Sequence, residues 1–382
     1  MLCGYRPTPA GGGTEKYVYE LTQGLLRRGL NVDIICEDRS FLPDASNPLS
    51  QHIIGTAPRP QNGRFSIEQF YEKSQRLAEM IEPDRYDVVH CHGHYGYHTV
   101  LRCAALERRP AVVSTFHLTA MGPIERYKQL GLNEPEEAPL DRAVACMEET
   151  MGRFSDKSIA VSRGVAHELS SLYGVPPCRI EVLSNWYDAE VFRPFDQAMA
   201  RRVLALKAGE RYLLYVGHFR MSRGKIMADV LRSLPQDVTL LVAYHQSDEA
   251  ISAEFGSRVR FTGHLSAQNL ALYYSDVDLL CFPALYGGFG LVLLEAMACA
   301  CPPVVFNYPA MNEVVTEQSG YLVTQPTAAA YAAVIQRALS EPRRKASGAR
   351  RRAAAFDMHS QIDAMRELYA KMVGSLAPTL SV

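Results

Sequence analysis

Short apolar runs alternate with helical patterns along most of the chain. Thr14–Arg28 places Val18, Leu21 and Leu25 on one helical face and is followed by Gly29, which suits a helix end. The β-rich runs of the first half are Val32–Cys36, Asp87–His90, Ala111–Thr115, Ser158–Val161 and Ile180–Leu183. This alternation predicts a parallel sheet covered by helices.

A second series of the same kind fills the other half. Its apolar runs are Tyr212–Val216, Val238–Ala243, Val259–Thr262, Leu279–Phe282 and Val304–Phe306, and helical patterns follow at Ala328–Leu339, Arg343–Arg352 and Ser360–Val373. Asn185–Pro194, polar and aromatic without a period, separates the two series. The sequence therefore predicts an α/β fold of two Rossmann-like domains with a cleft between them.

Three local features refine this picture. Ser162 suits the N-cap of a helix that ends at Tyr173–Gly174. Thr119–Glu149 breaks the alternation with mixed charge and three prolines, a composition typical of a cap that faces a substrate. Met1–Cys3 leads directly into Gly4, so either the first strand is very short or the natural start lies a few residues upstream, and we favour the second interpretation.

Composition narrows the class of protein. A length of 382 residues suits two domains, and 40 basic against 41 acidic side chains give no signature of nucleic-acid binding. The nine cysteines are scattered and form no C-x-x-C pair, which favours a reducing cytoplasm. We find no secretory signal and no apolar run of membrane-spanning length. Membrane contact is at most peripheral, and we interpret the basic Arg343–Arg352 helix as a solvated face.

Gly288–Ala298 carries the clearest chemistry. An apolar run ends at Pro283, a glycine-rich turn follows, and a helical pattern begins near Gly290. The glycines let the backbone approach a ligand, and the start of the helix offers N–H groups and a positive dipole end to a phosphate. Glu295 is expected about two turns into the helix, where its carboxylate can accept hydrogen bonds from a ribose. The stretch predicts a site for a nucleoside diphosphate.

This stretch resembles, almost letter for letter, the donor-site motif of family 4 retaining glycosyltransferases with the GT-B fold. The other segments that carry the resemblance are, in chain order, Gly11–Glu15, Asp87–His92, Val113–His117, Ala160–Ser162, Leu183–Pro194, Tyr215–Gly224, Asn312–Val315 and Ser319–Val323. Each motif is weak by itself, but all of them occur in the family's order.

The resemblance implies transfer of a hexose-type sugar from a nucleoside diphosphate sugar, with UDP favoured, to a small polar acceptor such as a cyclitol. Residues 1–190 would bind the acceptor, 191–355 the donor, and 356–382 would form a helix packed back on the N-terminal domain. The family needs neither a metal nor another cofactor. Whether the protein forms a homodimer is left open by the sequence.

The resemblance also implies site residues. The diphosphate would be bound by Gly12, Gly13, His218, Arg223, Phe289, Gly290 and Leu291, the nucleoside by Glu295, His264 and Leu265, and the donor sugar by Gly287, Gly288, Phe289 and Asn185. His117 and Arg223 would act in catalysis. The family's mechanism is usually drawn as front-face attack, in which the departing phosphate oxygen takes the acceptor's proton and no protein nucleophile is needed.

Four positions depart from the family pattern. His218 and Arg223 stand where the family usually has an arginine and a lysine that bind the diphosphate. Arg223 can substitute, whereas His218 is charged only part of the time near neutral pH. Gly287 replaces the first of two glutamates and leaves the identity of the sugar open. Ala300 replaces a favoured glycine and is expected to adjust packing only.

Other interpretations remain. His90, His92 and His94 alternate along a strand and could bind zinc, but no carboxylate or cysteine pair supports this. Glu37 after the second strand fits a nicotinamide dehydrogenase, although Lys16 stands in place of the third glycine of that motif. A lapsed sugar-nucleotide-binding protein and a phosphorylase are further options. Each main site residue also has a purely structural interpretation. Glu295 would be an exposed helix carboxylate, His117 would be a strand-end histidine whose hydrogen bonds are made within the protein, and Arg223 would belong to a solvated surface cluster.

Overall fold

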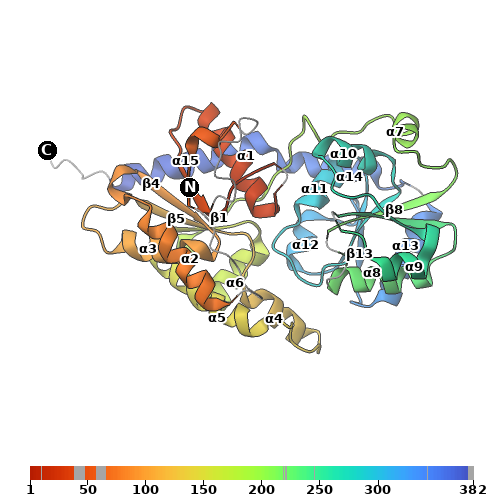
Figure 1. Cartoon of the computed structure of the whole chain (residues 1–382), viewed down its shortest axis with the longest axis horizontal. Coiled ribbons are helices and arrows are strands. Elements are labelled where there is room, and N and C mark those ends of the chain that lie inside the picture. Colours follow the sequence, from red (N-terminus) through yellow and green to blue (C-terminus); the bar gives the residue numbers. More distant parts are fainter. Residues whose placement is uncertain are drawn as a thin grey trace. The chain divides into compact units, whose positions relative to one another are not determined.

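The chain folds into two compact units, each built on a parallel sheet. The computed structural model describes residues 1–9, 11–37, 48–56, 66–217, 219, 222–244, 246–341 and 343–376. Unit 1 contains Met1–Asn185 and the segment from His359 onward, and unit 2 contains Trp186–Met358 (Figure 1). All strand pairs within both sheets are parallel, which confirms the predicted α/β fold.

Within the described residues, the sheet of unit 1 has seven strands. They are β1 (Leu2–Tyr5), β2 (Ile34–Glu37), β3 (Ile53–Thr56), β4 (Val88–His92), β5 (Ala111–Phe116), β6 (Lys157–Ala160) and β7 (Ile180–Val182). Their order is β3-β2-β1-β4-β5-β6-β7, so the direction of winding reverses between β1 and β4. In such a sheet the loops after these two central strands diverge and open a crevice at the carboxyl edge.

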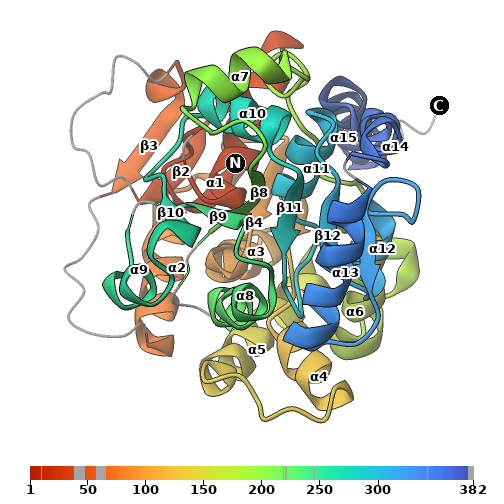
Figure 2. The same ribbon diagram turned by 90° about the vertical axis from the view of Figure 1, so that its right-hand side faces the viewer.

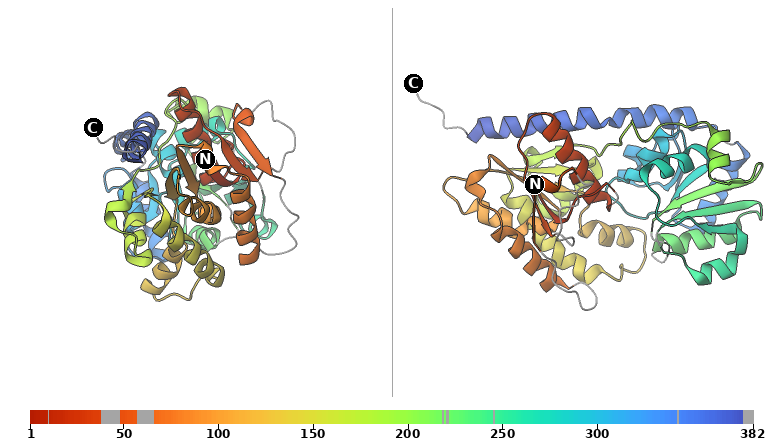
Figure 3. Two further views of the ribbon diagram at one scale, coloured as in Figure 1. Left: turned by 90° about the vertical axis from the view of Figure 1, so that its left-hand side faces the viewer. Right: turned by 45° about the horizontal axis from the view of Figure 1, so that its top comes forward.

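Helices cover both faces of this sheet. They are α1 (Gly13–Arg27), α2 (Ile67–Glu79), α3 (Tyr97–Ala104), α4 (Met121–Gln129), α5 (Ala138–Phe154), α6 (Arg163–Tyr173) and the part of α15 (Met358–Leu376) from His359 onward. Figure 3 shows α15 beside α1 on one face, while α2, α3 and α5 lie on the other. Arg28 binds Asp363 at 2.6 Å, and Gly24 leaves room for Ile362. The last helix therefore packs on the N-terminal unit.

Unit 2 repeats the layout, with six strands in the part of it that the structure describes. They are β8 (Arg211–Val216), β9 (Val238–Ala243), β10 (Val259–Phe261), β11 (Leu279–Phe282), β12 (Pro303–Phe306) and β13 (Tyr321–Val323), in the order β10-β9-β8-β11-β12-β13. The helices are α7 (Gln197–Val203), α8 (Ser222–Ser233), α9 (Glu249–Phe255), α10 (Ala267–Asp276), α11 (Leu291–Ala298), α12 (Pro309–Val314), α13 (Ala328–Ser340) and α14 (Ala346–Ala353). α10, α11 and α14 lie on one face of the sheet, and α8 and α13 on the other (Figure 2).

The elements agree with the sequence patterns in most places. Ser162 accepts a hydrogen bond from the Val165 amide, and Gly174 ends α6 in the left-handed conformation, so this predicted helix is confirmed. Thr119–Glu149 contains α4 and most of α5, with no strand between them. The units change at Asn185, where the prediction placed the boundary at residue 190, because Trp186 is buried and Tyr187 bridges to Asp357 within unit 2.

The basic Arg343–Arg352 segment is only partly a solvated face. Arg343 donates to the Ser275 carbonyl at 2.7 Å, and Arg352 donates to the Val314 carbonyl at 3.2 Å. Arg350 and Arg351 are exposed. The two end arginines therefore fasten α14 to unit 2, which the prediction of a solvated face missed.

Candidate functional site

The winding of unit 2 reverses between β8 and β11. The chain leaves β8 through Gly217 and enters α8, and it leaves β11 through Pro283–Gly290 and enters α11. Both connections lie at the carboxyl edge of the sheet, where ligands bind in open parallel sheets. Most of the predicted donor residues lie on these two connections.

The start of α11 is open to an anion. Gly290 is its N-cap, with φ +88°, and no side chain caps this end of the helix. A Cβ atom at Gly290 would lie 2.9 Å from Leu293 Cδ1, so both the conformation and the space favour glycine. The first amide groups, from Leu291 onward, are therefore available to a phosphate at the positive end of the helix dipole.

Arg223 lies in the first turn of α8 and is exposed. Its guanidinium carbon is 5.5 Å from the ring centroid of Phe282, at the end of β11. Burial raises the pKa of Tyr215 at the end of β8 to about 12, and the nearby charge of Arg223 opposes that shift. Among the residues that the structure describes, Arg223 has no acidic partner. Arg223 thus presents its positive charge at the point where the sheet reverses its winding.

Two described glycines near Arg223 occupy positions that a side chain would strain. Gly217 has φ +137°, and a Cβ atom at Gly224 would lie 1.6 Å from the Phe219 carbonyl oxygen. Phe219 itself is buried. His218, predicted to bind the diphosphate, lies outside the described residues.

Glu295 differs from its prediction in two respects. It is the fifth residue of α11, which begins at Leu291, so it lies a little more than one turn into the helix rather than two. It is only 4% exposed, so the alternative of an exposed helix carboxylate is wrong. Burial raises the pKa of the Tyr274 hydroxyl, and the Glu295 carboxylate adds to that shift. Glu295 is therefore a buried residue of α11 whose carboxylate lies near the Tyr274 hydroxyl.

Gly287, Gly288 and Phe289, predicted to contact the donor sugar, lie on the connection that leaves β11. The Gly287 carbonyl accepts a hydrogen bond from the Tyr308 hydroxyl at 3.1 Å. Gly288 and Phe289 are buried, and the Phe289 ring packs on Phe356. Any ligand contact by Phe289 must therefore use its backbone.

Two residues predicted for the nucleoside lie further along the carboxyl edge of the unit 2 sheet. His264 is exposed and Leu265 is half-buried, after β10, which is separated from β8 by β9. The structure places them on the same edge as Gly290 but two strands from the reversal point. Their roles stay predictions.

In unit 1 the winding reverses at the glycine loop. Gly12 and Gly13 are exposed after β1, and Gly12 is the N-cap of the fifteen-residue helix α1 without a side-chain cap. A Cβ atom at Gly12 would lie 2.6 Å from Glu15 Oε2. The loop offers open amides, but the Glu15 carboxylate stands beside them.

Histidines line the adjacent strands of unit 1. His90 and His92 on β4 are buried, with ring centroids 4.1 Å apart, and His117 follows β5. His117 stacks on His92 and meets the edge of the Tyr17 ring, with centroids 4.8 Å apart. Burial lowers the pKa of His117 to about 4, so its imidazole is neutral near pH 7. The contact of His117 with His92 was not predicted, although the alternate spacing of His90 and His92 already put those two on one face.

The alternative sites find no support in the structure. Among the described residues no group of three His, Cys, Asp or Glu side chains is arranged to hold a metal ion. Glu37, the carboxylate that suggested a dehydrogenase, is buried between Lys73, at 2.9 Å, and Arg76. Because both cations engage its carboxylate, Glu37 is not free to bind a ribose.

Asn185 and Glu148 are buried polar residues of unit 1. Asn185, predicted to contact the donor sugar, is 6% exposed, and its Oδ1 has no hydrogen-bond partner in the described part of the chain. Glu148 was not predicted. Burial raises its pKa to about 7, although the Tyr173 hydroxyl at 2.5 Å and the Ala120 amide at 2.8 Å both donate to it. Glu148 thereby holds the loop that follows His117.

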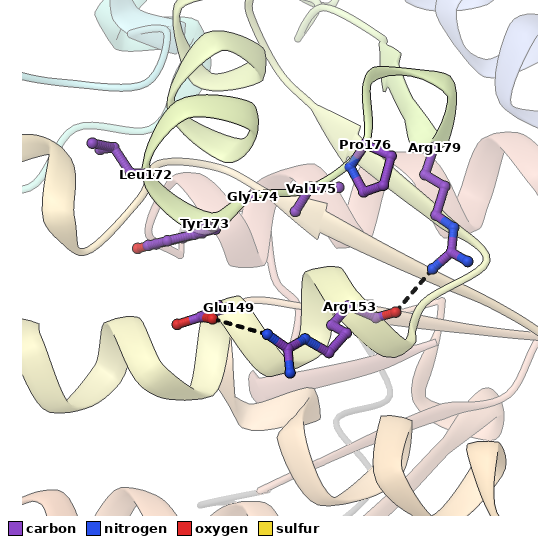
Figure 4. A pocket seen from close by; sticks show the side chains of 8 residues that line it. All are labelled: Glu149, Arg153, Leu172, Tyr173, Gly174, Val175, Pro176 and Arg179. Atoms are coloured by element: carbon purple, nitrogen blue, oxygen red, sulfur yellow. Dashed lines mark hydrogen bonds and ion pairs between the residues drawn. The ribbon is translucent and has the colours of Figure 1, made fainter.

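One pocket, of about 410 Å³, lies at the opposite edge of the unit 1 sheet. Its lining comes from the ends of α5 and α6 and from the chain that enters β7, as Figure 4 shows. Arg153 pairs with Glu149 at 3.4 Å, and Arg179 donates to the Arg153 carbonyl at 2.9 Å. None of the predicted site residues lines this pocket.

In the part of the chain that the structure describes, no helix is both long and apolar enough to cross a bilayer.

Comparisons with known proteins agree with this architecture. D-inositol 3-phosphate glycosyltransferase of Thermobispora bispora is 28% identical over 409 residues, which cover 98% of this chain and 93% of that protein. The Mycobacterium tuberculosis (strain H37Ra) protein of the same name is 28% identical over 398 residues, which cover 96% and 80%.

Solved structures show the same fold. Sucrose-phosphate synthase from Thermosynechococcus elongatus matches with a TM-score of 0.79 and 24% identity, covering 97% of this chain and 96% of that one. Anabaena HepE in complex with UDP-glucose matches with a TM-score of 0.71 and 19% identity, covering 97% and 99%.

Family models match both halves of the sequence. The model described as Glycosyltransferase Family 4 matches residues 11–191, and the model described as Glycosyl transferases group 1 matches residues 196–355. Together they cover most of both units. The chain therefore belongs to the family 4 glycosyltransferases with the GT-B fold.

Proposed function

We propose that the protein is a retaining hexosyltransferase that takes a nucleoside diphosphate sugar as donor and a small polar molecule as acceptor. One observation carries the proposal: the uncapped start of α11 and the exposed guanidinium of Arg223 stand on the two connections that flank the reversal point of unit 2. Both features attract a diphosphate.

These two groups act on the leaving diphosphate. Transfer builds positive character at the anomeric carbon and negative charge on the departing phosphate oxygens. Fixed donors that face this charge stabilise the transition state without reorganising. Arg223 supplies a full charge, and the amides from Gly290 to Leu291 supply oriented N–H groups. The buried carboxylate of Glu295 accepts hydrogen bonds from the ribose hydroxyls.

The proposed retention of stereochemistry does not require a nucleophile from the protein. In front-face attack the departing phosphate oxygen takes the proton of the acceptor hydroxyl, so no protein nucleophile is required. His117, with a pKa of about 4, is a weak base and suits a hydrogen-bonding role toward the sugar or acceptor. Because cationic and amide groups can balance the diphosphate charge, we propose that transfer needs no metal ion.

The comparisons guide the choice of substrates. Two relatives are named as D-inositol 3-phosphate glycosyltransferases, and one similar structure contains UDP-glucose. We therefore propose a UDP-sugar as donor and a cyclitol or cyclitol phosphate as acceptor. Nine free cysteines, seven of them buried, suit a reducing cytoplasm as the place of action.

A two-stage donor screen tests the proposal. Nucleotide sugars are first ranked by thermal shift, and the best are then incubated with inositol and D-inositol 3-phosphate, with and without EDTA, and the products are read by mass spectrometry and anomeric NMR. We expect a UDP-hexose to stabilise the protein and to give an α-linked product in both buffers. Tight binding without turnover on any acceptor would instead favour a sugar-nucleotide-binding protein, and loss of activity in EDTA that manganese restores would overturn the metal-free mechanism.

A further inference from the structure

His92 and His117 form a pair at the carboxyl edge of the unit 1 sheet. His92 ends β4 and pairs in register with Thr115 of β5, and His117 follows that strand. Nδ1 of His92 lies 3.4 Å from Nε2 of His117. The two rings are stacked, with centroids 5.6 Å apart and planes inclined by 25°. The contact therefore joins one specific nitrogen of each ring.

His90 uses its nitrogens differently. Its Nδ1 lies 2.5 Å from the Tyr369 hydroxyl, and its Nε2 lies 2.6 Å from Thr115 Oγ1. Both partners are hydroxyls, which can donate or accept, so they do not fix the tautomer of His90. His92, in contrast, has a buried Nε2 without a hydrogen-bond partner in the described part of the chain.

This difference decides where His92 carries its hydrogen. Burial lowers the pKa of His92 well below its usual range and that of His117 to about 4, so each ring is neutral and has a single N–H group. A hydrogen on Nε2 of His92 would be a buried donor without an acceptor. Orphaned buried donors are rarer in proteins than orphaned acceptors, because an acceptor lone pair is easier to leave unmatched. A hydrogen on Nδ1 instead reaches an acceptor, Nε2 of His117.

We propose that His92 is a positioning residue: it donates its Nδ1 hydrogen to Nε2 of His117 and thereby fixes His117 as the tautomer that carries its hydrogen on Nδ1. The inference deepens the proposed glycosyl transfer and, for its kinetic part, rests on it. Nδ1 of His117 has no partner among the described residues and is not among their buried polar atoms, so it is the nitrogen open to a ligand.

The fixed tautomer assigns a chemical role to His117. An Nδ1–H group donates to an oxygen lone pair, such as that of a sugar or acceptor hydroxyl. It cannot accept a proton, and the other nitrogen is occupied by His92. His117 therefore binds and orients an oxygen atom and does not act as a general base, which leaves the acceptor's proton to the departing phosphate.

NMR of the ¹⁵N-labelled full-length protein tests the tautomers without any substrate. Correlations between ring nitrogens and ring carbon-bound hydrogens show which nitrogen of each neutral imidazole carries the hydrogen. We expect His92 and His117 to carry it on Nδ1, with the signals assigned by their loss in His92→Asn and His117→Asn. A hydrogen on Nε2 of His92 overturns the proposal. Fewer than two Nδ1–H rings among the histidines that stay neutral at pH 6 also overturns it, even where the variants fail to fold.

Kinetics test the positioning role. The amide of an asparagine can place a donor near the position of Nδ1, whereas a glutamine places it near Nε2. We expect His92→Gln to lower kcat roughly three- to tenfold, the effect of one hydrogen bond, with the donor KM little changed. His92→Asn should keep kcat close to wild type. Equal loss in both variants, or loss in donor KM alone, contradicts the role.

Tyr369→Phe is the matched control. It removes a buried hydroxyl from His90 but leaves the His92–His117 contact in place. We expect a lower unfolding temperature and an unchanged kcat. If no transfer is found with any donor but both rings carry Nδ1–H, the proposed function fails and the tautomer assignment stands. If transfer is found and His92 carries Nε2–H, the assignment fails and the function stands.

Discussion

At the residue scale, Arg223 is the test of the diphosphate site. It is exposed at the start of α8 and has no acidic partner in the described part of the chain. A charge-assisted phosphate contact contributes about 1.5–3 kcal/mol. Arg223→Ala should therefore lower kcat/KM for the donor by roughly ten- to a hundredfold. Arg232→Ala removes the same charge at the far end of α8, where Glu254 already pairs with it, and should leave the kinetics unchanged. Wild-type kinetics in Arg223→Ala would remove this loop from the site.

Gly287 and Glu295 should divide the recognition of the donor between them. Glycine supplies no carboxylate, and a Cβ atom at Gly287 would lie 3.1 Å from the Tyr308 hydroxyl, which must shift by a few tenths of an ångström to admit it. Gly287→Glu should therefore change the ratio of kcat/KM between two UDP-sugars more than the affinity for UDP. Glu295→Ala should weaken all UDP-sugars about equally, because they share the ribose. If Glu295→Ala shifts the ratio and Gly287→Glu does not, the two roles are exchanged.

Glu148 should make unit 1 less stable as the pH rises. Its pKa is raised by burial from 4.5 to about 7, so the folded state holds the proton more tightly than the unfolded chain. Stability from this group is fully present below pH 4.5 and is lost as the pH rises to about 7, by up to about 3 kcal/mol.

Comparison with Glu148→Gln isolates this contribution from the buried histidines, whose lowered pKa values act in the opposite direction. Urea unfolding of both proteins between pH 4.5 and 8 measures it. We expect the wild type to lose stability relative to the variant across this range. Parallel curves would show that folding does not raise the pKa of Glu148.

At the element scale, the start of α11 depends on Gly290. Alanine there meets a φ of +88° and a contact of 2.9 Å with Leu293 Cδ1, so the helix start must move. Gly290→Ala should lower stability by about 1–2 kcal/mol and also weaken nucleotide binding. Gly29→Ala has the same kind of strain, at φ +81°, but no atom within 4 Å, so it should lower stability alone. Calorimetric titration with UDP separates the two, and equal UDP affinity in both variants would show that α11 does not bind the phosphate.

Elements buried on both faces were the easiest to predict. All six residues of β5 are buried, and none of them is charged. β3, in contrast, is a half-exposed edge strand, and it was missed. α2 was missed although Ser66 and Gln69 form a capping box that the sequence displays.

In the candidate site, residues of local motifs could be predicted, and contacts between distant segments could not. Gly290 and Arg223 could be predicted because each belongs to a local strand–turn–helix motif. The contact of His92 with His117 and that of Glu148 with Ala120 could not, because both depend on which strands and helices are neighbours in space. Sequence periodicity gives the face of an element but not its partner.

At the scale of the whole molecule, unit 1 is completed by the last helix. A Cβ atom at Gly24 of α1 would lie 2.3 Å from Ile362 Cδ1 of α15, so this glycine allows the two helices to approach. Gly24→Ala should destabilise the protein by about 1–3 kcal/mol through overpacking. In an Ile362→Ala background the same change should be neutral or stabilising by up to about 1 kcal/mol, because alanine favours helix. Thermal unfolding of the wild type, the two single variants and the double variant measures the coupling free energy between Gly24 and Ile362. Additive effects would mean that this contact does not determine how closely the two helices pack.

The chain order of the two units has a consequence for synthesis. Residues from His359 onward belong to the same unit as Met1–Asn185, so unit 2 is an insertion in unit 1. Unit 2 is continuous and can fold as soon as it leaves the ribosome, whereas the nascent N-terminal half waits for its last helix. At about 5–20 residues per second, the intervening segment takes on the order of ten to thirty seconds to translate. During that time the face of unit 1 that receives Ile362 and Tyr369 is uncovered. We expect a chaperone to bind the nascent chain at this face.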